Sequence, residues 1–473
     1  MGGSFAVKRM PIKPKTVFFY SAMIAAAVGL FYWIRSAGES LVAPLQASLG
    51  RFGRGAPTES AGVLTHVLLA LVVIILAARG LGAIFQRFNQ PAVIGEMIAG
   101  ILLGPSLLGH ALPSVSAYLL PNQVAPYLSV IANIGVILYM FLVGVELNTT
   151  LLSDRTHASV ATSHASIIVP FLLGSGLALW LYPIFSTSDV RFVVFALFMG
   201  VSMSVTAFPV LARIITDRQM QDTPLGTIAL ACAAVDDVTA WCLFALVVSV
   251  ARAHAGHVLV TLGLTAGFIF AVFAFIRPGA VWFARRHALR RQTGQGSIVI
   301  ACVALLVAAL TTQVIGIHAL FGAFLVGAVI PHDSPLAADI KQKFEDLVVV
   351  LFLPTFFAFT GLRTQIGLVH GVRDWLICIL IIVVASVGKF GGGAIAARLT
   401  GLDWRQAASL GILMNTRGLM ELIVLNVGLD LGVLSPTLFA MLVIMAIVTT
   451  LATTPVLHAL TREPERIAVG EII

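Results

Sequence analysis

Apolar stretches long enough to cross a lipid bilayer fill most of this chain. A helix rises 1.5 Å per residue, so about 20 apolar residues are needed to cross roughly 30 Å of hydrocarbon. Only 11% of the 473 residues are charged and the mean hydropathy is +1.01, which excludes an ordinary soluble domain. The sequence predicts an all-α polytopic membrane protein. The predicted spans are 17–34, 63–83, 91–108, 126–147, 159–184, 191–216, 225–251, 257–277, 297–315, 318–331, 347–362, 375–397, 405–429 and 435–459.

The positive charge of the chain follows its predicted topology. The net charge is +8, and the basic residues lie mainly in short loops between the predicted spans. With the amino terminus in the cytoplasm, seven arginines fall outside, Lys389 and Arg417 fall within spans, and the other 20 of the 29 Lys and Arg fall inside. This asymmetry predicts both termini in the cytoplasm and no binding of nucleic acid. We expect an integral protein of a bacterial inner membrane.

Motifs for several other kinds of chemistry are missing from the sequence. The cysteines lie in apolar runs without CxxC spacing, which disfavours disulfides and zinc. There is no G-x-x-x-x-G-K-[ST] and no Rossmann fingerprint, so we expect no nucleotide-binding domain and no cofactor. HExxH and GxSxG are also absent, and no enzymatic activity is predicted. Adjacent aspartates alone leave a membrane aspartyl protease as a remote alternative.

The first span stands apart from the others. Its basic start is also typical of a signal anchor or a cleaved signal peptide, although Ala37 and Gly38 form a weak cleavage site. We favour an extra helix, followed by a linker over 36–60. The expected organisation is an N-terminal segment over 1–62, a membrane domain over 63–460 with thirteen core helices, and a short cytoplasmic tail over 461–473.

Two predicted spans are interrupted near their middle. One reads V-S-M-S-V-T-A-F-P over 201–209, and the other reads G-I-L-M-N-T-R-G-L-M-E over 411–421. Proline and glycine disfavour helix, and unwound backbone at membrane depth is tolerated only where it lines a cavity inside the protein. The spans lie seven apart and cross in opposite directions, which predicts inverted six-helix repeats over 63–251 and 297–460, joined by a linker helix over 257–277. Paired broken helices are the best sequence indication of a transporter's binding site, although each alone could be an ordinary kink.

Two adjacent carboxylates, Asp236 and Asp237, lie in the middle of the span over 225–251. One acidic residue at a helix centre costs about 2.5–3.5 kcal/mol on insertion scales, and two neighbours also repel each other. Successive helical positions are turned by about 100°, so the two carboxylates can face different partners. A carboxylate that holds either a proton or a cation is what ion exchange requires. The alternative is a pair that is salt-bridged only to hold helices together.

Lys389 lies deep within another predicted span. A carboxylate neighbour stabilises a buried ammonium, so we expect Asp236 or Asp237 as its partner. The surrounding glycines, Gly388 and 391–393, indicate close helix packing but do not explain the charge. The alternative is a lysine that snorkels to the inner interface.

Three more charged residues lie within predicted spans. Arg417 and Glu421 are four residues apart on the second broken span and can neutralise each other. Glu96 lies five residues into its span, where it could gate an inner funnel. Gly100 and Gly104 in the same span form G-x-x-x-G, which favours close helix packing.

Five strings resemble the monovalent cation:proton antiporter superfamily, particularly the branch of Kef-type, Nap-type and plant cation/H⁺ exchangers. The strings are GEMIAGILLGPSLLG, SVTAFPVLARI, AVDDVTAW, HALFGAFLVGAVIP and NTRGLMELIVLNVG. The resemblance covers the core from Val63 to Leu460. It implies the Nha-type fold, a homodimer, and an elevator-like movement of a core (transport) domain against a dimer domain.

The resemblance also implies roles for individual residues. Asp237 matches the aspartate that binds the monovalent cation, and Asp236 matches the aspartate that pairs with a lysine, here Lys389. The crossing segments are matched by Ser204 and Thr206 in the first and by Asn415, Thr416 and Arg417 in the second. An Asp-Asp pair with a lysine resembles electrogenic members, which implies two protons per cation. The nucleotide-binding regulatory domain of full Kef systems is not expected in this chain.

The sequence therefore predicts a secondary active antiporter that exchanges Na⁺ or K⁺ for protons across the bilayer. The main alternative is a cation-selective channel, or a K⁺ efflux pathway, that uses the same carboxylates without obligatory exchange. An organic-anion symporter is disfavoured, because two aspartates make a poor site for an anion.

Overall fold

The computed structural model describes residues 14–39, 41, 60–88, 90–146, 157–220, 223–252, 258–289 and 295–461, and these are almost entirely helical. The helices are α1 (Pro14–Gly38), α2 (Ser60–Arg87), α3 (Ala92–Leu103), α4 (Leu108–Ala111), α5 (Pro113–Leu119), α6 (Ala125–Glu146), α7 (His157–Phe185), α8 (Phe192–Ser204), α9 (Phe208–Asp217), α10 (Pro224–Arg252), α11 (Val258–Ala271), α12 (Arg277–Leu289), α13 (Gln295–Ile315), α14 (Ala319–Ala328), α15 (Pro335–Leu347), α16 (Leu353–Arg363), α17 (Gly371–Ser386), α18 (Gly392–Leu399), α19 (Trp404–Met414), α20 (Leu419–Asp430) and α21 (Pro436–Thr461). Short 3-10 helices cover Asn122–Val124 and Ile366–Leu368, and π-helical turns cover Val272–Ile276, Val348–Phe352 and Val387–Gly391.

Each predicted span contains helix, but one is shorter than expected. Twelve helical segments of the described chain are long and apolar enough to cross a membrane, and α19 with α20 forms a further broken span that is bent by 43°. The segment predicted over 318–331 is helical only in the ten residues of α14, a length of about 15 Å that cannot cross a bilayer. The left-handed backbone at Gly316 and His318 stops helix before α14. The all-α polytopic fold is thus confirmed, although this span is four residues shorter than the 14 residues predicted.

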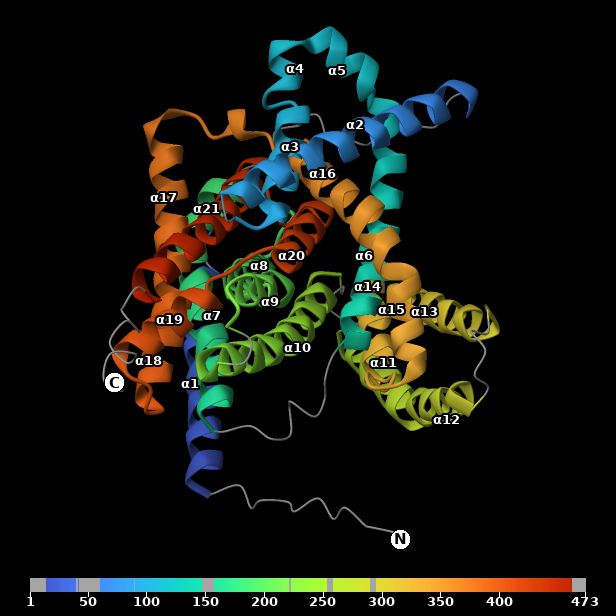
Figure 1. The fold of residues 1–473 in the computed structure, drawn as a ribbon. Coiled ribbons are helices and arrows are strands. Elements are labelled where there is room, and N and C mark those ends of the chain that lie inside the picture. Colours follow the sequence, from blue (N-terminus) through green and yellow to red (C-terminus); the bar gives the residue numbers. More distant parts are fainter. Residues whose placement is uncertain are drawn as a thin grey trace, which may run out of the picture.

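The helices form two groups that make most of their contacts within themselves. The first group contains α2, α3, α6 and α11–α16, and the second contains α1, α7–α10 and α17–α21. Figure 1 shows the first group on the right and the second on the left. Among the described residues, α16 contacts α20 and α10 contacts α11 across the boundary between the two groups.

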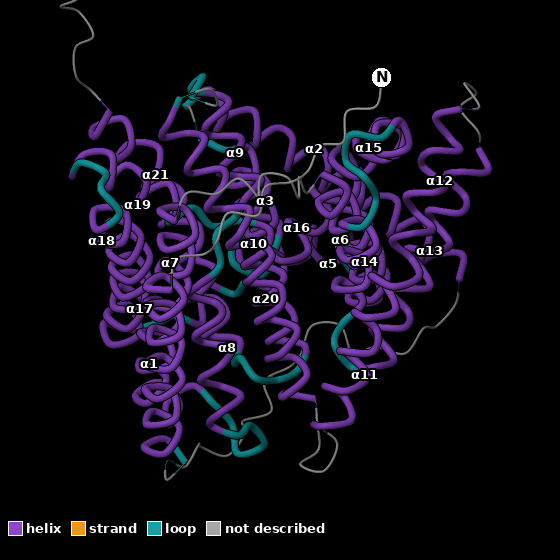
Figure 2. The backbone as a smooth tube through the Cα atoms, turned by 90° about the horizontal axis from the view of Figure 1, so that it is seen from below, coloured by secondary structure: helices purple, strands orange, loops and turns teal. Residues whose placement is uncertain are grey.

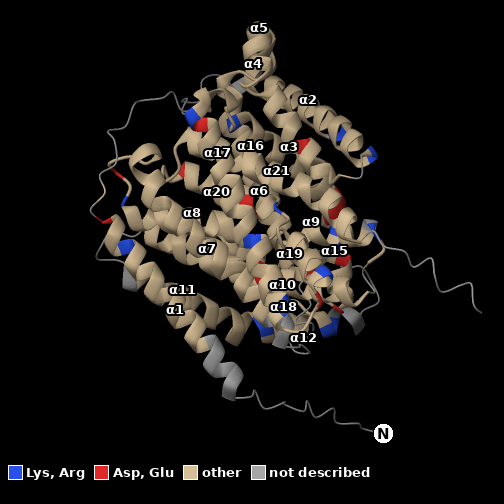
Figure 3. Ribbon diagram, turned by 90° about the vertical axis from the view of Figure 1, so that its left-hand side faces the viewer, with Lys and Arg blue, Asp and Glu red and all other residues tan. Residues whose placement is uncertain are grey.

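One face of the molecule carries a concentration of basic side chains. Arg213 and Arg218, at the end of α9, and Lys341, on α15, all lie at this face, which we call the basic face. Figure 2 shows α9, α12 and α15 toward this face, and Figure 3 shows charged residues gathered on their side. Charged residues are sparse among the helices between the basic face and the opposite face, as expected for the part of a protein that hydrocarbon surrounds.

Glycines allow α3 and α16 to touch through their backbones. A Cβ atom at Gly100 would lie 2.5 Å from the Cα atom of Ala358, and one at Gly104 would lie 3.1 Å from the Cα atom of Leu362. Only glycine fits at 2.5 Å, and at 3.1 Å a Cβ atom would require the neighbouring backbone to shift by a few tenths of an ångström. The G-x-x-x-G signal of the sequence thus marks a real helix contact, and α3 and α16 form a tightly joined pair.

The extra first helix packs on the second group. α1 contacts α7 and α8, and Phe31 packs against Phe171 of α7 with ring centroids 5.8 Å apart. Gly38 lies directly against the ring of Phe192 at the start of α8. Most of the linker predicted over 36–60 lies outside the described residues.

Both predicted helix breaks are present. α8 ends at Ser204 and α9 begins at Phe208, with Pro209 in its first turn, where a missing N–H is tolerated. α19 ends at Met414 and α20 begins at Leu419. The two crossing segments, 205–207 and 415–418, are hydrogen-bonded to each other, since the Ala207 N–H donates to the Thr416 carbonyl at 3.0 Å.

Candidate ion-binding site

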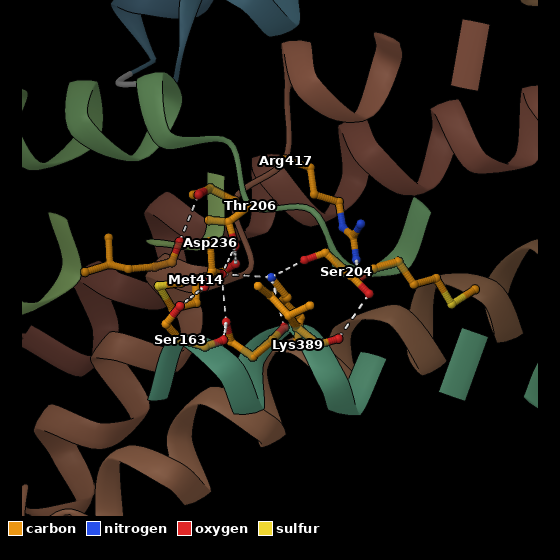
Figure 4. Close-up of polar contacts among 12 residues, drawn as sticks. Ser163, Ser204, Thr206, Asp236, Lys389, Met414 and Arg417 are labelled. Atoms are coloured by element: carbon orange, nitrogen blue, oxygen red, sulfur yellow. Dashed lines mark hydrogen bonds and ion pairs between the residues drawn. The ribbon is translucent and has the colours of Figure 1, made fainter. Parts of the chain in front are cut away.

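The carboxylate of Asp236 is surrounded by donors at the point where the broken helices cross. Ser163 donates to its Oδ1 atom at 2.5 Å, while Ser166 and Thr206 donate to Oδ2 at 2.7 and 2.8 Å. Lys389 adds a charged hydrogen bond to Oδ2 at 3.2 Å. An ionised carboxylate only accepts hydrogen bonds, so four donors around a fully buried Asp236 suit its charged form (Figure 4).

Lys389 uses all three of its donors inside the protein. Besides Asp236, its ammonium donates to the carbonyls of Ser166, at 2.9 Å, and Ser204. The side chain is fully buried, so the snorkelling alternative does not hold. Lys389 lies in the π-helical turn Val387–Gly391, and such wide turns are frequent at functional sites. Of its two possible partners, the structure gives Asp236.

Ser163 and Ser166 of α7 were not among the predicted site residues. Both hydroxyls are buried and donate to Asp236, and Ser166 also supplies a carbonyl to Lys389. A possible signal was the run of Thr162, Ser163 and Ser166 in an otherwise apolar span. Small hydroxyl residues are common in membrane helices, however, and sequence alone does not say which carboxylate they face.

Replacing Ser166 by alanine should lower the free energy of unfolding by about 1.5–3 kcal/mol, because it removes a hydrogen bond to a buried charge. The matched control is Ser175→Ala on the same helix, where a buried hydroxyl donates to the neutral carbonyl of Ala196 at 3.1 Å. We expect about 0.5–1.5 kcal/mol there. Unfolding titrations in mixed micelles measure both values, and equal losses would contradict a charged Asp236.

Arg417 caps the interrupted end of α8. Its guanidinium donates to the carbonyls of Ser202 and Met203 at 2.8 and 3.0 Å, and to Glu421 at 2.8 Å. A helix carries partial negative charge at its carboxyl end and leaves its last carbonyls unpaired, so a cation is favourable there. Glu421 lies in the first turn of α20, where a carboxylate suits the opposite pole. The pair thus neutralises two helix ends that face each other within the membrane.

Asp237 differs from its neighbour in its surroundings. It is also buried, but its Oδ1 atom has no hydrogen-bond partner among the described residues. The side-chain oxygen of Asn415, in the second crossing segment, is likewise buried without a donor. Thr416 instead donates its hydroxyl to the Leu413 carbonyl at 2.8 Å. The unpaired oxygens of Asp237 and Asn415 are of the kind that serve as ligands for hard cations.

Glu96 is not part of the cluster around Asp236. It lies on α3 and lines a cavity of about 480 Å³ that also reaches Tyr139, Pro209, Lys341 and Leu419. Glu96 is only 7% exposed, and no hydrogen bond or ion pair joins it to another described residue. Near the cavity mouth, Lys341 pairs with Glu146 at 2.5 Å. The cavity lies between the two helix groups and approaches the crossing from the basic face.

Comparison with known proteins places the chain in a family. Residues 67–462 match the family described as "Sodium/hydrogen exchanger, transmembrane". The chain is 43% identical over 395 residues to the Na(+)/H(+) antiporter NhaS4 of Synechocystis sp., covering 83% of this chain and 96% of that protein. It is 38% identical over 419 residues to Cation/H(+) antiporter 19 of Arabidopsis thaliana, covering 87% of this chain and 52% of the plant protein.

Two more distant proteins extend the comparison. K(+)/H(+) antiporter 1 of Saccharomyces cerevisiae is 32% identical over 407 residues, which cover 84% of this chain and 46% of the yeast protein. The chain therefore spans about half the length of the plant and yeast relatives. The fold is similar to that of the sodium proton antiporter MjNhaP1 from Methanocaldococcus jannaschii, with a TM-score of 0.57, 15% identity, and coverage of 84% of this chain and 96% of that one. The chain belongs to the sodium/hydrogen exchanger family, which confirms the resemblance to cation:proton antiporters that its motifs indicated.

Proposed function

We propose that this protein exchanges a monovalent cation for protons, with Asp237 as the group that alternately holds the proton and the cation. The observation that carries this proposal is a fully buried Asp236–Lys389 pair next to an unpaired, buried Asp237, at the crossing of two broken helices. Buried charges of this kind are unfavourable in a membrane and mark ion pathways. Asn415 and backbone carbonyls of the crossing would complete the coordination of the cation.

Lys389 supplies the second proton in this proposal. A cation that binds at Asp237 also attracts the neighbouring Asp236, which weakens the hold of Asp236 on the ammonium of Lys389. A buried ammonium without its carboxylate loses a proton readily. One cation would then be exchanged for two protons, one from Asp237 and one from Lys389, and each cycle would move one net charge.

Alternating access is proposed to follow from the two helix groups. The second group carries Asp236, Asp237, Lys389 and both crossings, so its movement as one body against the first group would carry the site across the membrane. We propose that the basic face is cytoplasmic, because basic residues favour that side, and that Glu96 attracts cations into the cavity. We further propose a homodimer that is formed through the first group, as the family resemblance implies.

The names of the relatives point to two candidate cations. The cyanobacterial relative is named for Na⁺ and the yeast relative for K⁺, while the plant relatives are named only for a cation. We therefore propose Na⁺ or K⁺ as the substrate. A carboxylate, an amide and carbonyls are oxygen ligands that suit either ion.

Proteoliposomes that contain the full chain and a trapped pH indicator provide the test. Adding Na⁺ or K⁺ outside acid-loaded vesicles should raise the internal pH, and the rate should depend on an imposed membrane potential. Li⁺ and Rb⁺ complete the series of cations. Cation flux without proton movement would instead identify a channel and contradict the proposal.

A further inference from the structure

Arg363 ends α16 and reaches across to α20, far from the crossing of the broken helices. Its guanidinium donates to the side-chain oxygen of Asn426 at 3.1 Å and to Asp430 at 2.6 Å. It also lies over the ring of Phe359, 5.4 Å from the centroid. An arginine that makes two hydrogen bonds and lies over an aromatic ring is held in one fixed geometry, unlike a flexible surface lysine.

Asn426 makes a second link between the same two helices. Its amide nitrogen donates to the hydroxyl of Thr360 on α16 at 2.8 Å and to the Leu422 carbonyl at 2.9 Å. Asn426 and Thr360 are buried, and the side chain of Arg363 is only 13% exposed. Partial burial makes these contacts stronger than those of an exposed ion pair.

α16 and α20 are joined at one end and separated at the other. α16 belongs to the first helix group and α20 to the second. At the other end of α16, Leu353 and Phe357 line the cavity that opens at the basic face, and Leu419 of α20 lines the same cavity. The two helix groups are therefore held together on the side of Arg363 and held apart on the side of the basic face.

We propose that the cluster of Arg363, Asn426, Asp430 and Thr360 is a clamp that closes the face opposite the basic face. The clamp must open in each transport cycle before the site around Asp237 can reach that face. This proposal rests on the proposed alternating access. It assigns Arg363 a role in setting the conformational equilibrium, and none in binding the transported cation.

Weakening the clamp should shift the population toward the state that is open on its side. Two single-cysteine reporters measure this shift, in a background where the four native cysteines are replaced by alanine. Val93→Cys reports on the cavity, which Val93 lines, and Phe356→Cys reports on the buried segment one turn below Thr360. In nanodiscs, a charged thiol reagent reaches both faces, so no sidedness of insertion is required.

Arg363→Gln should raise the labelling rate at position 356 relative to position 93 by about tenfold, which corresponds to about 1.4 kcal/mol in the equilibrium. Asp430→Asn should shift the ratio in the same direction, and because Asp430 is 57% exposed this variant is expected to fold even if Arg363→Gln does not. Arg35→Gln is the matched control. It removes an ion pair of similar length, 2.7 Å, that lies at the end of α1 and links no helix groups.

An unchanged ratio in both clamp variants would overturn the proposal. So would a uniform rise that also includes a third reporter, Phe439→Cys, in the packed interior, because this pattern indicates general loosening. The labelling assay does not depend on ion flux. Failure of the clamp with transport intact is therefore distinct from failure of the proposed exchange.

Discussion

Replacing Asp237 by asparagine should reduce proton-coupled cation flux to the level of protein-free liposomes while leaving the fold intact. Asparagine has the same shape, but it neither binds a proton nor neutralises a cation. The Oδ1 atom of Asp237 makes no hydrogen bond with the described residues, so little structural interaction is lost. The change also removes a carboxylate that is desolvated and next to Asp236, and both effects oppose burial of the charge. Thermal unfolding should therefore show equal or higher stability.

Asp236→Asn provides the contrasting variant for this experiment. It removes the carboxylate that Lys389, Ser163, Ser166 and Thr206 all face, and it leaves a buried ammonium without its partner. Flux and stability should then both fall. Transport that survives in Asp237→Asn would remove Asp237 from the exchange. A loss of stability equal to that of Asp236→Asn would show that Asp237 has a structural role instead.

Replacing Arg417 by glutamine should lower the free energy of unfolding by about 3–5 kcal/mol, the range found when one partner of a buried ion pair is removed. The variant leaves the fully buried Glu421 unpaired and frees the carbonyls of Ser202 and Met203 at the end of α8. The double variant Arg417→Gln, Glu421→Gln should recover part of the loss, because no uncompensated charge remains. Unfolding titrations of the three variants measure the coupling.

The ion pair of Lys341 with Glu146 is the matched control for Arg417. It is shorter, at 2.5 Å compared with 2.8 Å, but its side chains are 47% and 42% exposed. Lys341→Gln should therefore change stability by at most about 1 kcal/mol. If Arg417→Gln has no larger effect than Lys341→Gln, Arg417 does not stabilise the crossing in the way described.

The sequence was most informative where a residue broke a local rule. Pro209 and Gly418 are poor residues for a helix interior, and both predicted interruptions exist. Asp236 and Lys389 are expensive in hydrocarbon, and they form a pair. Such residues stand out because their unfavourable free energy is large compared with that of the apolar background.

Other features depend on tertiary contacts that leave a weak trace in the sequence. Ser163 and Ser166 look like ordinary small residues of a membrane helix, and only the approach of α10 gives them a carboxylate to bind. The π-helical turn that contains Lys389 was likewise not predicted from the sequence. The span over 318–331 was predicted, but its exact bounds were not, because apolar composition does not reveal where helix begins and ends, which here depends on the backbone at His318.

The backbone contact between α3 and α16 has a mechanical consequence. Because Gly100 already touches the Cα atom of Ala358, halfway along α16, this helix cannot retreat from α20 by bending toward α3. Packed interiors resist compression, so α3 and α16 behave as one rigid unit. Any separation of α16 and α20 at Arg363 must then come from movement of the second helix group, which carries α20. The same movement would narrow the cavity that Leu353 and Phe357 line at the other end of α16.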